Sequence, residues 1–174
     1  MSDKFTTEHT IVRLRVPLGR PYAQAIDDFE RTVPVVDAPR IKALDNWDGV
    51  VKLSESEAPL GLMRYASIDV QPFLATSPTK RLGTEYLMGN HVYAERMYRH
   101  KPAAMLYAPL RLFIYADDDG QGVLVMEQPS RQFGSLGNPD VTAVGIELDE
   151  KVAGVLEALG VEAPASLTAS ATTP

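Results

Sequence analysis

The chain has 174 residues, enough to form one domain with a sizeable hydrophobic core. Its formal net charge of −6 would repel a phosphate backbone, so no nucleic acid is expected as a partner. The absence of cysteine excludes disulfides, thiolate nucleophiles and cysteine-ligated metals. No apolar run reaches the ~18–20 residues that span a bilayer, and the first residues lack the apolar stretch of a signal peptide. We therefore expect a cytoplasmic protein without membrane contact.

The N-terminal part predicts a strand followed by an amphipathic helix. In residues 10–16 apolar and basic side chains alternate, which is typical of a half-buried strand, and Pro17 and Gly19 are expected to end it. Beyond Pro21, four apolar side chains recur with helical spacing, and the helix is expected to close before Pro34. These four are Tyr22, Ile26, Phe29 and Val33.

Residues 35–59 carry weaker signals than the segments around them. Ile41, Leu44 and Trp47 indicate a short helix, and the acidic run 54–57 is interpreted as a loop.

The central segments alternate between sheet and helix. Residues 60–69 and 81–88 show the alternation of strands, and the segment between them contains two prolines and is predicted as a loop. Residues 90–99 form the next helix, which must end before Pro102.

The C-terminal half predicts a hairpin and a long helix. Two alternating runs, 110–115 and 122–127, flank the acidic turn 117–120, which is a strong hairpin signal. Asn138 precedes a proline and an acid, as at the start of a helix, and Gly160 supplies the stop about five turns later.

Together these elements predict an α+β fold: an antiparallel sheet covered by helices, of β-α-β(4)-α type with an inserted short helix. We assign residues 1–160 to a single domain. Residues 161–174 are rich in Pro, Ala, Ser and Thr and are expected to form a disordered tail. A sheet covered by helices in this way often leaves a cavity between the two layers.

Residues 89–111 concentrate the polar chemistry of the chain. This stretch joins the predicted helix to a core strand and contains two of the three histidines and three of the seven tyrosines. Polar groups gathered at the end of a scaffold element are where a binding site is expected.

The two histidines of this stretch have separate alternatives. They are nine residues apart, so on one helix His91 and His100 point in opposite directions and cannot share a metal ion. His91 lies one turn from Glu95, as two ligands of a metal site would, but it equally fits a surface histidine with Glu95 paired to Arg99. His100 in the last turn fits a helix cap, or alternatively an axial haem ligand or a proton carrier.

Tyr98, Tyr107 and Arg111 complete the candidate site. Arg111 is out of phase with its apolar neighbours and therefore projects from the other face of the sheet. Its guanidinium could clamp a ligand carboxylate, although pairing with Glu127 across the hairpin is the favoured interpretation.

The same residues carry a family resemblance. Gly89-Asn90, a helix ending at His100, Pro102, and the run from Tyr107 to Arg111 resemble the bacterial proteins catalogued as domain of unknown function 302. Further matches are Gly61-Leu62-Met63, Gln128-Pro129-Ser130 and residues 147–151. The resemblance implies a β-α-β(4)-α arrangement of the TATA-binding-protein-like type and no particular activity. Family members usually carry proline after Gly-Asn, whereas this chain has His91.

Three functions remain open at this point. The first is the binding of a small, partly apolar ligand between sheet and helices, oriented by Tyr98, Tyr107 and Arg111 with His91 or His100 at the mouth. The second is a haem- or metal-dependent enzyme with His100 or His91 as ligand. The third is a homodimeric interaction module that uses an uncovered sheet edge or an apolar helix face.

Overall fold

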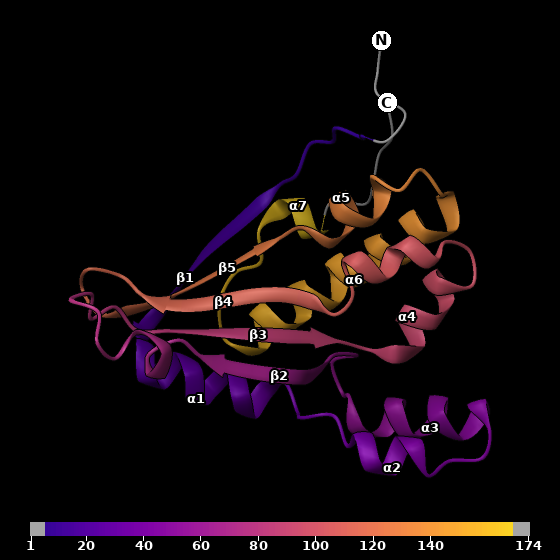
Figure 1. Cartoon of the computed structure of the whole chain (residues 1–174), viewed down its shortest axis with the longest axis horizontal. Helices are drawn as coiled ribbons and strands as arrows, with labels where there is room; N and C mark the ends of the chain where they lie inside the picture. Colours follow the sequence, from indigo (N-terminus) through magenta and orange to yellow (C-terminus); the bar gives the residue numbers. More distant parts are fainter. Residues whose placement is uncertain (1–5, 169–174) are drawn as a thin grey trace.

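A five-stranded antiparallel sheet in the order β1-β5-β4-β3-β2 forms the centre of the computed structural model, which describes residues 6–168 (Figure 1). The strands are β1 (Arg13–Pro21), β2 (Met63–Asp69), β3 (Gly83–Gly89), β4 (Leu110–Ala116) and β5 (Gln121–Glu127). The helices are α1 (Tyr22–Thr32), α2 (Ala38–Lys42), α3 (Trp47–Glu57), α4 (His91–Tyr98), α5 (Pro129–Gly134), α6 (Pro139–Ala158) and α7 (Ala165–Thr168). Two 3-10 turns are η1 (Pro72–Leu74) and η2 (Pro102–Leu106). The predicted α+β class is confirmed.

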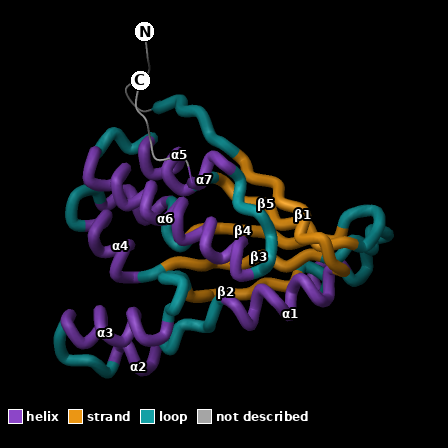
Figure 2. Tube along the Cα trace, turned by 180° about the vertical axis from the view of Figure 1, so that it is seen from behind, coloured by secondary structure: helices purple, strands orange, loops and turns teal. Residues whose placement is uncertain are grey.

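Helices α1 and α6 cover one face of the sheet (Figure 2). Alternate side chains of each strand point to this face, so that Leu112 and Ile114 of β4 are buried there. The apolar stripe of α6 packs against them with residues such as Leu148 and Val152. Burial of these side chains is the main force that holds the two layers together.

The opposite face of the sheet carries no helix among the described residues (Figure 1). The intervening side chains of the strands point to it, including Phe113 of β4, Val125 of β5 and Leu87 of β3, which are half-buried. We call this surface the open face.

Residues 35–59 differ from the prediction. They form two helices, and the acidic run 54–57 is the last turn of α3 instead of a loop. Asn46 starts α3 by accepting a hydrogen bond from the Gly49 N–H at 2.8 Å. Carboxylates at a helix C-terminus oppose the helix dipole, so the acidic run lies at the less favourable end of α3.

The two ends of the domain also extend further than expected. Strand β1 continues through Pro17 to Pro21, because a proline without an N–H is tolerated on an edge strand. The predicted disordered tail begins too early: α7 is ordered and places Leu167 in the core with 2 % of its surface exposed. The remainder of that predicted tail, residues 169–174, lies outside the described residues.

Within residues 6–168, no helix is both long enough and apolar enough to cross a membrane.

Candidate functional site

A cavity of about 310 Å³ lies where helix α4 and turn η2 pack against the ends of β3 and β4. Its deepest walls are the buried side chains of Met97, Leu110, Phe133 and Leu148. The polar side chains of Tyr65, Asn90 and His91 are gathered at one end of the lining, and Tyr93 of α4 adds a further phenol ring. We call this space the apolar cavity.

The Gly89-Asn90 pair positions helix α4 above this cavity. The Asn90 side-chain oxygen accepts a hydrogen bond from the Val92 N–H at 2.8 Å, which caps the helix. The Asn90 amide group donates to the Gly61 carbonyl at 3.1 Å, which fixes the helix start to the segment before β2. Gly89 leaves room beside it, because a Cβ there would lie 3.8 Å from the Tyr65 ring and from Pro109.

His91 stands at the centre of a chain of hydrogen bonds. Its Nε2 lies 2.7 Å from the Ser54 hydroxyl, and its Nδ1 lies 2.9 Å from the Tyr65 hydroxyl. The Ser54 hydroxyl donates to the Val50 carbonyl at 2.7 Å. A hydroxyl has one proton, so Ser54 accepts from the Nε2–H of His91, and the Nδ1 accepts from Tyr65.

Burial keeps both ring systems neutral. It lowers the pKa of His91 below its ordinary value, and it raises the pKa of Tyr65 to about 12. At neutral pH the polar end of the cavity therefore carries hydrogen-bonding groups without charge.

The Ser54–His91–Tyr65 chain resembles a nucleophile, a base and an orienting group in spacing only. Ser54 is 1 % exposed, lies inside helix α3, and donates its hydroxyl proton to the Val50 carbonyl. These hydrogen bonds therefore have a structural role: they connect α3, α4 and β2.

The expectation of His91 as an exposed surface histidine is wrong, because His91 is half-buried and both of its nitrogens are hydrogen-bonded, one to Ser54 and one to Tyr65. The accompanying ion pair between Glu95 and Arg99 is confirmed. Among residues 6–168, no three His, Asp or Glu side chains are grouped as a metal site.

Tyr98 and His100 lie away from this cavity. Tyr98 is an exposed residue of helix α4. His100 lies at the surface with its Nδ1 3.6 Å from a carboxylate oxygen of Asp140, at the start of α6. Neither residue contributes to the lining of the apolar cavity.

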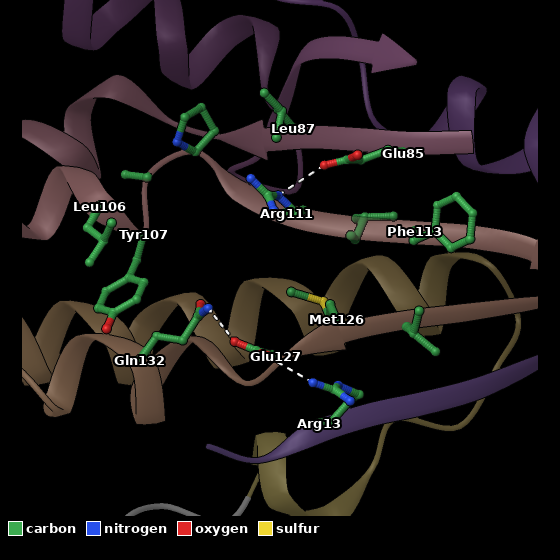
Figure 3. A pocket seen from close by; sticks show the side chains of 14 residues that line it. Arg13, Glu85, Leu87, Leu106, Tyr107, Arg111, Phe113, Met126, Glu127 and Gln132 are labelled. Atoms are coloured by element: carbon green, nitrogen blue, oxygen red, sulfur yellow. Dashed lines mark hydrogen bonds and ion pairs between the residues drawn. The ribbon is translucent and has the colours of Figure 1, made fainter. Parts of the chain in front are cut away.

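Tyr107 and Arg111 line a second hollow, a depression of about 640 Å³ on the open face (Figure 3). The predicted partner of Arg111 is wrong: its Nε lies 3.0 Å from Glu85 on β3, not beside Glu127 (Figure 3). Glu127 is instead engaged by Arg13 at 3.3 Å and by the Gln132 amide at 3.0 Å. We call this hollow the sheet-face depression.

A buried carboxylate holds helix α5 against α6 and thereby places Phe133 in the cavity wall. Asp149 accepts hydrogen bonds from the Ser130 N–H at 2.9 Å, the Ser130 hydroxyl at 2.5 Å and the Gln128 amide at 2.6 Å. Burial raises the pKa of Asp149. The motif Gln128-Pro129-Ser130 and the motif around Asp149, both noted in the sequence, thus form one network.

The sequence contained little to identify Tyr65 as a residue of the polar cavity end, or Ser54 as the partner of His91. Tyr65 is out of phase with the apolar side chains of its predicted strand, which is the one local signal of a special position. Ser54 lay in the run interpreted as a loop, where a hydroxyl is unremarkable.

The fold and the cavity define the class: an antiparallel sheet backed by helices on one face, with an uncharged cavity at the end of its central strands. The model of the family described as domain of unknown function DUF302 matches residues 50–159, and the chain belongs to this family. The resemblance expected from the sequence is therefore confirmed.

The chain is also similar to a solved structure, the crystal structure of an uncharacterized conserved protein DUF302 from Bacillus stearothermophilus. The TM-score is 0.61 with 13 % sequence identity, over 84 % of this chain and 97 % of that chain. At that identity the similarity shows the fold alone. A comparison with curated proteins gave no significant match.

Proposed function

We propose that this protein binds a small, neutral and largely apolar molecule in the apolar cavity. The observation that carries the proposal is a hollow of about 310 Å³, with mostly apolar walls and the hydrogen-bonded pair Tyr65–His91 at one end. This is the usual composition of a small-molecule site, at the lower end of the usual size.

The lining selects the charge of the ligand. Among the described lining residues none is an Asp, Glu, Lys or Arg, and burial lowers the pKa of His91 and so favours its neutral form. A charged ligand would lose its hydration without gaining an opposite charge, which is strongly unfavourable. Met97 and Met105 add flexible walls that adapt to ligand shape.

The hydrogen-bond chain selects the polar group of the ligand. The Tyr65 proton is donated to His91, so the phenolic oxygen keeps its lone pairs as acceptors. A ligand hydroxyl or N–H can donate to this oxygen while the apolar body fills the hollow. The favoured ligand therefore has one donor group at one end.

Of the five residues predicted to bind a ligand, the proposal retains His91. The other four, Tyr98, His100, Tyr107 and Arg111, lie outside the lining of this cavity. No observation favours the haem or metal enzyme, since both nitrogens of His91 are engaged and His100 lies at the surface.

The test uses N-phenyl-1-naphthylamine, a neutral apolar probe with one N–H donor, whose fluorescence rises in apolar surroundings. We expect saturable binding to the wild-type protein. Ala94→Phe places a ring in the cavity and should weaken binding at least tenfold. Ala103→Phe, at an exposed position of η2 outside the lining, is the matched control and should bind as the wild type does.

Circular dichroism establishes that each variant is folded, and native mass spectrometry of the wild-type protein detects a co-purified small molecule. The proposal is overturned if the wild type shows neither saturable probe binding nor a co-purified molecule. It is equally overturned if folded Ala94→Phe binds the probe as tightly as Ala103→Phe.

A further inference from the structure

We infer that the open face of the sheet is the contact surface of a homodimer, in which two copies of this chain pack sheet against sheet about a two-fold axis. This inference is independent of the proposed ligand, because it rests on the other face of the sheet. Four observations support it.

The first observation is the apolar centre of the open face. Cross-strand pairing places the half-buried Val125 beside Phe113, and the fully buried Val123 beside the half-buried Tyr115. Phe113 and Tyr115 stack with their ring centroids 6.0 Å apart, and the Phe113 ring covers Gly83, where a Cβ would approach it to 2.3 Å. A sheet with large apolar side chains on both faces requires a second layer on each.

The second observation is that the charges of this face suit a copy of itself. Arg13 and Arg111 lie on it together with Glu127 and Glu85 (Figure 3). In a two-fold contact the same patch meets itself, so a face with one sign of charge would repel its copy. Here each copy offers both signs, and the two arginines are more exposed than their glutamate partners.

The third observation is shape. Leu106 of turn η2 is 76 % exposed at the border of the sheet-face depression, which has a volume of about 640 Å³ (Figure 3). A projecting apolar side chain and a hollow on one patch are what an isologous contact needs, since each copy supplies both.

The fourth observation is area. Five strands about 4.8 Å apart, each about 24 Å long, give a face of roughly 570 Å², so complete overlap of two copies would bury about 1,100 Å². This is just above the ~1,000 Å² that a specific interface requires.

The edges of the sheet are poor alternatives for pairing. Edge strand β1 contains Pro17 and Pro21 and shifts register between them, which interrupts a row of free hydrogen-bonding groups. At the start of edge strand β2, Arg64 already pairs with the chain at Val35. The uncovered edge named as a dimer surface in the sequence analysis is thus less suited than the face.

Sedimentation equilibrium of the full chain at ~100 μM and physiological salt tests the inference. We expect a mass of twice the 19.0 kDa chain for the wild type. Leu106→Glu should shift the mass to that of the monomer, and Val125→Lys, at the centre of the face, should do the same. Phe73→Glu is the matched control, because Phe73 is 78 % exposed but does not line the depression; it should remain dimeric.

Leu106 is exposed, so its replacement should leave the circular dichroism spectrum of the chain unchanged. A monomeric wild type overturns the inference, and a small molecule would then be the better occupant of the depression. A wild-type dimer that persists in folded Leu106→Glu and Val125→Lys overturns the assignment of the face.

Discussion

The two hollows of this protein share a wall and differ in almost everything else. Ala108 and Pro109 line both the apolar cavity and the sheet-face depression. The Tyr107 ring, on the depression side, packs edge-on against Phe133, on the cavity side, with the centroids 5.9 Å apart. Yet the cavity has no charged lining residue among those described, whereas the depression holds two Arg–Glu pairs.

The difference follows from the side chains that surround each hollow. The cavity is lined mostly by apolar side chains of β4, α4, α5 and α6, so an unpaired charge there would lose hydration without gaining a counter-charge, and Tyr65 and His91 are bonded to each other. The depression faces outward on an uncovered sheet, where charges keep their hydration until a partner arrives. The segment between β3 and β4 thus contributes to both proposed sites, the small-molecule cavity on one side and the dimer surface on the other.

The largest expected effect is the loss of stability when the aromatic side chain beside each hollow is replaced by alanine. Phe133 is 0 % exposed, so Phe133→Ala should lower the free energy of unfolding by about 3–5 kcal/mol, whatever the protein concentration. Phe113 is half-buried on the open face, and in dilute monomer Phe113→Ala should lower it by about 1 kcal/mol. Urea unfolding measured across a range of protein concentrations gives both values.

At higher concentration the loss in Phe113→Ala should grow if the inferred dimer forms, because the variant would then also lose part of the contact between the two copies. Equal losses of unfolding free energy for Phe133→Ala and Phe113→Ala at every concentration would contradict the distinction between a buried cavity wall and an open sheet face.

Much of the scaffold of both hollows could be predicted because its signals are local. Gly89-Asn90 marks the start of α4, the turn 117–120 marks the hairpin β4–β5, and Asn138 marks the start of α6. Each of these needs only the geometry of a few consecutive residues. The amphipathic stripe of α6 then shows which of its faces turns to the sheet.

The polar end of the cavity could not be predicted because it depends on distant partners. His91 meets Ser54 and Tyr65, which are 37 and 26 residues away in the chain. Likewise, Glu85 and Glu127 lie on the two strands beside Arg111, and only the packing around Glu127 decides between them. Local spacing restricts which groups can meet, and tertiary contacts choose among them.

The pH dependence of the unfolding free energy tests whether the cavity end disfavours a charged His91. Burial lowers the pKa of His91, so below the ordinary value of 6.5 the unfolded chain binds more protons at this residue than the folded one. The contribution of His91 to stability is therefore complete above pH 6.5 and decreases as the pH falls from 6.5 through the folded pKa. Replacing the imidazole removes this dependence.

We expect the wild type minus His91→Phe difference in unfolding free energy to decrease from pH 7.5 to pH 5. Thermal or urea unfolding at several pH values measures it. A difference that stays constant, or that increases toward low pH, would show that the folded state does not disfavour the charged imidazole.

The smallest effect is expected from the charges of the depression. Arg111 is 77 % exposed and Glu85 is 31 % exposed, so in dilute monomer their ion pair is solvated on an open surface. Such pairs are worth about 0–1 kcal/mol and are screened by salt. A double-mutant cycle with Arg111→Gln and Glu85→Gln should give a coupling in that range that shrinks as salt is raised. A salt-independent coupling of several kcal/mol would mean that the ion pair is buried even in the monomer. Solvent exposure of the pair would then no longer explain why the depression contains charged side chains and the cavity does not.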